Sequence, residues 1–177
     1  AINAANDNPG EDLITFNVSS GGWRYLKPNE MLPMIRDTLI IDGTTQPGYE
    51  GSPLIEIYGH RQELGSGLVV QSTSNVIIRG LCLRSFPYYG IAISESQNVT
   101  IEACYIGTNH TATASGSNKH HGIYVSNSVD VVIGGNLPEK GNIISGNIKS
   151  GISITGSSNI SIWSNIIGQG ATPGVIL

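Results

Sequence analysis

The sequence has little charge, few aromatic side chains and no long apolar run. Charged residues make up 12% of its 177 positions, about half the usual share, aromatic residues make up 6%, and the formal net charge is −4. Without a basic stripe, nucleic acid is not an expected partner. No apolar stretch approaches the ~18 residues of a membrane-spanning helix, so no membrane insertion is expected. Two cysteines, Cys82 and Cys104, are too few for a disulfide framework.

What the sequence does have is glycine, 23 residues of it, in a repeat. The copies open on Gly67, Gly90, Gly122, Gly151 and Gly174, at spacings of 23, 32, 29 and 23 residues. The base period is therefore 23, with insertions of 9 and 6 residues. The four full copies read GLVVQSTSNVII, GIAISESQNVTI, GIYVSNSVDVVI and GISITGSSNISI.

Each copy encodes short strands with one apolar side. In the copy that begins at Gly122, Ile123 and Val125 flank the variable Tyr124, and this period-2 alternation is typical of a strand with one buried face. Two more strands follow in each period after turns. A single copy cannot bury its apolar face, but stacked copies can, because equivalent positions then lie about 4.8 Å apart.

The repeat therefore predicts an all-β fold, a right-handed parallel β-helix with about 23 residues and three short strands per coil. We expect one domain over residues 1–177. Residues 1–66 form irregular first coils behind a short N-terminal capping helix, and 67–177 form regular coils with insertions near 107–121 and 136–141. The frames of a leucine-rich repeat, a propeller blade and a left-handed hexapeptide helix fit less well.

Several motifs resemble a known group. They are AINAANDNPGEDLITF, DTLIIDGTTQPGYEGSPLIEI, YIGTNHTATASGSNKHHGIYVSNS and VVIGGNLPEKGNIISGN. These stretches look like the right-handed parallel β-helix repeat proteins of secreted bacterial origin, which share the pectin-lyase-like superfold. The resemblance implies a fold and a secreted, extracellular or cell-surface location. It implies no activity, since most such proteins have none assigned.

One polar column recurs eight residues after each leading glycine: Asn75, Asn98, Asp130 and Asn159. Asparagine tolerates left-handed backbone, and stacked side-chain amides hydrogen-bond their neighbours, so we interpret the column as a structural ladder at a turn. Ser96, Ser128 and Ser157, with Thr73, form a parallel hydroxyl column.

No catalytic set is apparent, and no cofactor is expected. The outward columns stack no two carboxylates; Arg79 beside Glu102 is interpreted as an exposed salt bridge. A Ca²⁺ site remains a weaker alternative, with ligands from Asp37, Asp42, Glu50 and Glu56. Metal capture by His110, His120 and His121, in an insertion that we expect to be an exposed flexible loop, is another. Cys104 is predicted to point inward and Cys82 outward, which argues against their pairing.

Three function hypotheses follow. The first is a non-catalytic structural or adhesive protein that stacks head-to-tail into a filament or array, with Val175, Ile176 and Leu177 at the subunit edge. The second is a carbohydrate-binding module that uses the outward aromatics Tyr105, Tyr124 and Trp163. The third is a polysaccharide lyase or hydrolase by fold analogy alone. Asn109 and Asn17 are the sequons we expect to be accessible for glycosylation.

Overall fold

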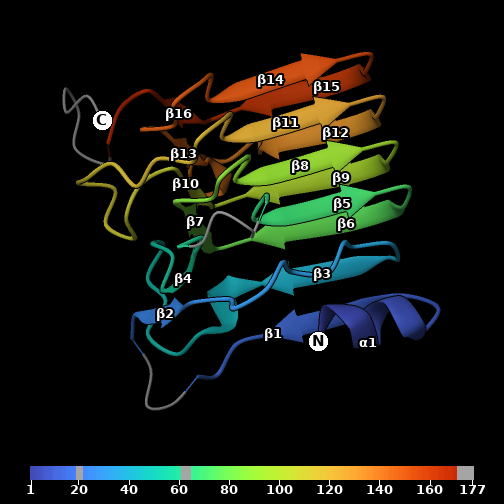
Figure 1. The fold of residues 1–177 in the computed structure, drawn as a ribbon, viewed down its shortest axis with the longest axis horizontal. Coiled ribbons are helices and arrows are strands. Elements are labelled where there is room, and N and C mark those ends of the chain that lie inside the picture. Colours follow the sequence, from blue (N-terminus) through green and yellow to red (C-terminus); the bar gives the residue numbers. More distant parts are fainter. Residues whose placement is uncertain (19–21, 61–64, 171–177) are drawn as a thin grey trace.

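A computed structural model describes residues 1–18, 22–60 and 65–170. It is built from short parallel strands stacked in successive coils, with one short helix at the N-terminal end (Figure 1). None of its helices is both long and apolar enough to cross a membrane. The three walls of the tube are three parallel sheets. From Leu68 on, each coil has one strand in every sheet, in the same order, whereas the first two coils have strands in only two of the sheets.

The strands of each sheet are stacked in order along the tube. The first wall, sheet A, contains β1 (Asp12–Thr15), β3 (Leu39–Asp42), β6 (Ser74–Arg79), β9 (Gln97–Glu102), β12 (Val129–Gly134) and β15 (Ser158–Trp163). Sheet B contains β2 (Arg24–Leu26), β4 (Ile55–Tyr58), β7 (Leu81–Arg84), β10 (Tyr105–Ile106), β13 (Ile143–Ile144) and β16 (Ile166–Ile167). Sheet C contains β5 (Leu68–Gln71), β8 (Ile91–Ser94), β11 (Ile123–Ser126) and β14 (Ile152–Thr155).

The pairing register is the one that the repeat predicts. Ile91, Ile123 and Ile152 are paired residues of sheet C, and so are Ile93, Val125 and Ile154. Inward columns of aliphatic side chains fill the tube, and most of them have no exposed surface in the middle coils. Fully burying one such side chain contributes about 1.5–3 kcal/mol, so the stacked columns carry the stability of the fold.

The helix α1 (Ile2–Asp7) lies at the N-terminal end of the tube, as the sequence predicts. In its coil the helix precedes β1, at the point of the chain where later coils place a sheet C strand. Ala5 is 5% exposed within the core, and Ile2 packs against the same core. The side chain of Asn6 holds the helix to the next coil, since it donates to the Met34 carbonyl and accepts from the Arg36 N–H.

The expected flexible loop at 107–121 is instead packed against the outside of sheet B. Thr108 and Ala112 are buried, and a β-bridge joins Thr108 to Ser115. Beneath the loop lies a small second core outside the tube, made of Cys82, Tyr105, Ala112 and Ile143. The prediction of an exposed loop was wrong because these outward side chains are apolar and need a cover.

The two polar columns are both present. All four ladder residues have positive φ, between 53° and 59°. Asn98 donates to Asn75 over 2.7 Å, and Asn159 donates to Asp130. In the hydroxyl column the Oγ atoms of Ser96, Ser128 and Ser157 each accept a backbone N–H from the preceding coil, that of Thr73, Ser96 and Ser128 respectively.

Two further asparagine pairs were not predicted. Asn142 donates to Asn165 over 2.8 Å, and Asn118 donates to Asn147 over 2.8 Å. Asn142 and Asn118 are buried, and their oxygens accept the backbone N–H groups of Cys104 and Phe86. These side chains satisfy the backbone where the coil changes direction.

Candidate functional site

The outer face of sheet B carries a continuous row of aromatic rings near the N-terminal end. We call it the aromatic strip and define it by the rings of His110, Trp23, Tyr25, Tyr58 and His60, in that spatial order. Successive ring centroids are 4.7, 5.8, 5.2 and 5.9 Å apart. Trp23 is 42% exposed, so the strip is open to a ligand.

Strand pairing in sheet B places these side chains side by side. Tyr25 on β2 and Tyr58 on β4 point outward because their neighbours Leu26 and Ile57 belong to the inward column. Arg84 is the register partner of Tyr58 on β7. His110 comes from the insertion that covers sheet B, and it stacks on Trp23 with only 23° between the ring planes.

Two cationic side chains on the same face of sheet B lie against the rings of the strip. The Arg84 guanidinium lies 4.5 Å from the Tyr58 centroid, and the Lys27 ammonium lies 5.1 Å from that of Tyr25. Cation–π contacts of this kind contribute about 0.5–1 kcal/mol when exposed. Burial raises the pKa of the Tyr25 hydroxyl, and Tyr58 and Glu56 add to the rise while Arg84 opposes it. Tyr25 is therefore a neutral phenol at physiological pH, able to donate a hydrogen bond.

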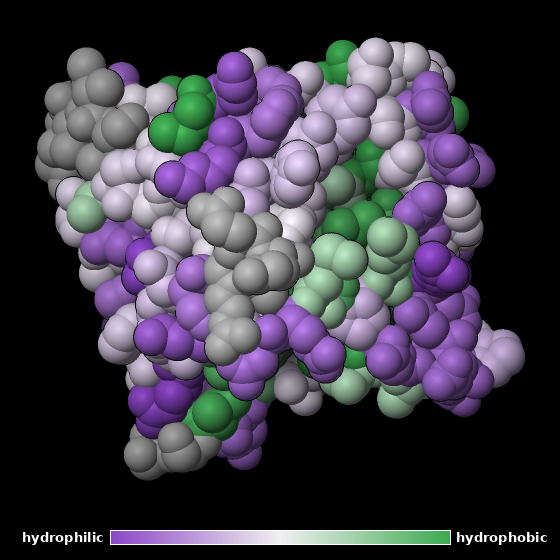
Figure 2. Space-filling view, in the orientation of Figure 1, coloured by the Kyte–Doolittle hydropathy of each residue, from purple (hydrophilic) through white to green (hydrophobic). Residues whose placement is uncertain are grey.

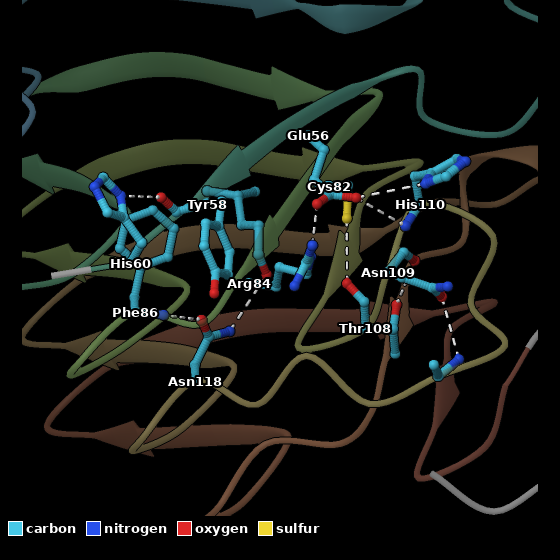
Figure 3. Close-up of polar contacts among 12 residues, drawn as sticks. Glu56, Tyr58, His60, Cys82, Arg84, Phe86, Thr108, Asn109, His110 and Asn118 are labelled. Atoms are coloured by element: carbon cyan, nitrogen blue, oxygen red, sulfur yellow. Dashed lines mark hydrogen bonds and ion pairs between the residues drawn. The ribbon is translucent and has the colours of Figure 1, made fainter. Parts of the chain in front are cut away.

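A buried carboxylate, that of Glu56, holds residues of the strip in place. Glu56 is fully buried; its Oε1 accepts from Arg84 Nε over 2.6 Å and its Oε2 accepts from the His110 N–H over 3.3 Å (Figure 3). The His110 ring is also near, with Nδ1 3.5 Å from Oε2. Glu56 thus ties the insertion to β7 and holds Arg84 and His110 in place. Because it is buried and both of its oxygens have partners, Glu56 is out of reach of a bound ligand.

The aromatics named from the sequence do not form one surface. Tyr105, Tyr124 and Trp163 lie on sheets B, C and A, respectively. Tyr105 was expected outside and points away from the tube, but it is only 8% exposed because the insertion covers it. Trp163 is 53% exposed on β15.

Tyr124 belongs to a second aromatic cluster, on the sheet C side. Its ring stacks on Tyr89 at 4.7 Å and lies 6.2 Å from His121. His121 accepts the Ser150 N–H through Nδ1. Burial lowers the pKa of His121, and the adjacent His120 lowers it further.

The histidines proposed as metal ligands are therefore divided. His110 belongs to the aromatic strip, whereas His120 and His121 pack around Tyr89. Within the described ranges, no group of three or more His, Cys, Asp or Glu side chains is placed to hold a metal ion.

The four acidic residues proposed for Ca²⁺ also lie apart. Asp42 pairs with Arg79 at 2.6 Å, while Glu56 pairs with Arg84 in the strip. Asp37 accepts the Thr38 and Gly10 N–H groups, and Glu50 is exposed.

The Arg79–Glu102 pair is part of a larger network than the expected exposed salt bridge. Arg79 lies between Asp42 and Glu102, and Lys140 binds the other oxygen of Glu102 at 3.2 Å. Glu102 is only 7% exposed. Burial alone would raise the pKa of Asp42, but hydrogen bonds from Arg79 and Thr44 outweigh it and lower that pKa.

The sequon asparagines differ in their surroundings. Asn17 is exposed. Asn109 has its side-chain oxygen occupied by the Thr113 and Ala114 N–H groups, and its amide nitrogen donates to Thr113. The edge residues Val175, Ile176 and Leu177 lie outside the described residues.

The strip itself was missed because Trp23, Tyr25 and Tyr58 lie in the irregular N-terminal third, where no repeat aligns them. One signal was available. Residues 55–58 and 81–84 share the alternation of a strand, and matching them places Tyr58 beside Arg84.

Three stacked parallel sheets with an aliphatic interior and side-chain ladders at the turns define a β-helical solenoid. The chain belongs to the right handed beta helix region family, whose model matches residues 56–177. No curated protein and no solved structure matches the chain.

Proposed function

We propose that this β-helix is a non-catalytic module that binds polysaccharide through the aromatic strip, in an extracellular or cell-surface setting. The observation that carries the proposal is the unbroken row of five rings on one rigid face. The C–H face of a sugar ring packs against an aromatic face, and the phenol, imidazole and ammonium groups at the edges offer hydrogen bonds to hydroxyls.

The rigidity of the strip supports this function. Tyr25 and Tyr58 sit on strands, and His110 sits on a loop fixed by Glu56, so these three rings lose little side-chain freedom when a ligand binds. One face of the molecule is mixed, with strongly hydrophilic residues along its right and lower parts and a hydrophobic patch right of its centre (Figure 2). Among the aromatic side chains, the strip and the smaller Tyr89–Tyr124 cluster are the groupings that a glycan could contact.

The structural hypothesis of head-to-tail stacking has less support from the geometry. In such a stack the C-terminal coil of one copy pairs with the N-terminal end of the next. α1 lies at that end, where Ile2 and Ala5 pack against the core, so the next copy would have to contact this helix as well as the terminal strands β1 and β2. An adhesive role through glycan binding needs no free N-terminal end.

Affinity electrophoresis in gels that contain neutral or acidic polysaccharides tests the proposal. We expect retardation by at least one polymer, and a loss of affinity of about tenfold or more in Trp23→Ala and Tyr58→Ala, because a central aromatic contact contributes about 1.4 kcal/mol or more. Trp163→Ala is the matched control, since Trp163 is also exposed, by 53% against 42% for Trp23, but lies on sheet A.

A complete panel without retardation would reject the function. Retardation that survives both strip substitutions but not Trp163→Ala would move the binding site to the other wall.

A further inference from the structure

Two histidines and three tyrosines gather where the middle coils turn from sheet B into sheet C. The rings of Tyr89, His121 and Tyr124 are almost parallel, with 9° between Tyr89 and His121 and 14° between Tyr89 and Tyr124. His120 packs edge-on against Tyr89 and His121, with ring centroids 5.0 and 4.5 Å away. Tyr88, beside Tyr89, is 56% exposed. We call these five residues the histidine corner.

The two histidines of the corner offer hydrogen-bond donors. His121 accepts the Ser150 N–H through Nδ1 over 3.1 Å, so its neutral ring carries the proton on Nε2. Nδ1 of His120 is buried, and no hydrogen bond reaches it from the described part of the chain. A proton on that nitrogen would be a buried donor without an acceptor, so this ring too carries its proton on Nε2.

The charged side chains around the corner are all positive. Lys119 precedes His120, and the Lys149 N–H donates to the His120 carbonyl over 3.1 Å. Both lysines are exposed, and within the described ranges no carboxylate pairs with either of them. No Asp or Glu occurs in the three stretches that form the corner, residues 84–94, 116–126 and 143–155.

Donors and ammonium groups without a carboxylate are suited to an oxyanion. A planar carboxylate pairs best with the fork of an arginine, whereas a lysine acts as a point charge. Arg84 is the one arginine in those stretches, and Glu56 occupies it. A sulfate or phosphate ester has three free oxygens that accept from separate donors. The exposed ring of Tyr88 beside these donors matches the C–H face of a sugar.

We propose that the histidine corner binds a sulfate or phosphate ester carried by a sugar. The oxyanion accepts from the Nε2–H groups of the two histidines and pairs with the two ammonium groups, while the sugar packs on Tyr88. The corner shares no residue with the aromatic strip, so the proposal does not rest on the function of the strip.

NMR signals of the four histidine rings test the proposal. The 177-residue chain is titrated at pH 7.5 with glucose 6-phosphate and, separately, with galactose 6-sulfate; the ester that saturates identifies the anion. We expect saturable shifts of the His120 and His121 signals with at least one of them, while those of His60 and His110 stay in place. Glucose and glucuronate should bind at least about tenfold more weakly, because each lacks the tetrahedral anion.

Three variants separate the anion contact from the sugar contact. Lys149→Gln should weaken binding of the ester several-fold, and Lys27→Gln, an exposed lysine of the strip face, is the matched control that should change nothing. Tyr88→Ala should weaken the sugar ester but leave the weaker binding of the inorganic anion unchanged. Circular dichroism and urea midpoints establish that the variants fold.

The absence of a saturable shift with both esters overturns the proposal. So does equal affinity for glucose or glucuronate, or equal affinity of Lys149→Gln and the wild type. Inorganic phosphate or sulfate that binds as tightly as the ester would reject the sugar, and tighter binding of adenosine monophosphate would assign the corner to a nucleotide instead. None of these outcomes bears on the strip, whose test depends on Trp23 and Tyr58.

Discussion

At the scale of single residues, three carboxylates on the outside of the wall are buried although they point away from the core. Asp42, Glu56 and Glu102 all lie on outward positions, yet each is less than 10% exposed. Each is paired with an arginine, and Arg79 serves two of them. An unpaired buried carboxylate costs free energy, so each of these three carboxylates depends on its arginine partner.

The lowered pKa of Asp42 makes its contribution to stability depend on pH. A carboxylate with a lower pKa in the folded than in the unfolded chain stabilises the fold above the unfolded pKa, and the effect is lost as the pH falls through the folded value. We expect Asp42→Asn to lower the free energy of unfolding by about 2 kcal/mol at pH 7. The difference from wild type should shrink below about pH 4.

Urea denaturation at pH 7, 5 and 3 measures this difference, and the exposed Glu50→Gln serves as the control that should change nothing. An equal loss at pH 7 and pH 3 would show that the charge of Asp42 is irrelevant.

The two thiols provide a second test at this scale. Burial raises the pKa of Cys104 to about 12 and raises that of Cys82 well above its usual value. Only the thiolate reacts with disulfide reagents, so neither should react in the native protein at pH 8, and both should react after unfolding. Rapid labelling of Cys82 in the native chain would mean that the insertion does not cover it.

At the scale of elements, the turns are held by side-chain ladders as much as by the strands. Ser128 has no exposed surface; its Oγ accepts the Ser96 N–H and donates to the Ser126 carbonyl. One hydroxyl thus satisfies two backbone groups and links two coils.

Removing that hydroxyl should therefore cost more than a surface serine does. We expect Ser128→Ala to lower the free energy of unfolding by about 1–3 kcal/mol, the range for leaving a buried polar group without its partner. Ser158→Ala, at an exposed position on the next coil, should stay within about 0.5 kcal/mol of wild type in the same urea titration. Equal effects would contradict the ladder as a source of stability.

The side-chain ladders show which polar contacts can be predicted from the sequence and which cannot. The Ser96–Ser128–Ser157 column and the left-handed Asn75, Asn98, Asp130 and Asn159 were both predicted, because the repeat places equivalent residues one above the other. The Asn118–Asn147 pair was not, because an insertion separates its members by 29 residues. The Asn142–Asn165 pair keeps the 23-residue period, but the spacing does not show that these two side chains turn toward each other to form a hydrogen bond.

At the scale of the whole molecule, periodicity determines what is predictable. The β-helix and its register follow from the repeat. The capping helix follows instead from the stretch AINAAND, which ends at the helix-breaking sequence Asn8-Pro9-Gly10. The aromatic strip does not, because it joins an irregular segment around Trp23 to an insertion that carries His110. Likewise, the burial of Tyr105 depends on where the insertion folds back, which no spacing records.

The central claim is that the aromatic strip binds polysaccharide, and the two tryptophans of the chain allow it to be tested directly. In Trp163→Phe the only tryptophan left is Trp23, in the strip, so its fluorescence reports on that site. We predict a saturable change when a retarding polysaccharide is titrated into Trp163→Phe, and none in Trp23→Phe. A signal confined to Trp23→Phe, or no saturable signal in either variant, would contradict the account.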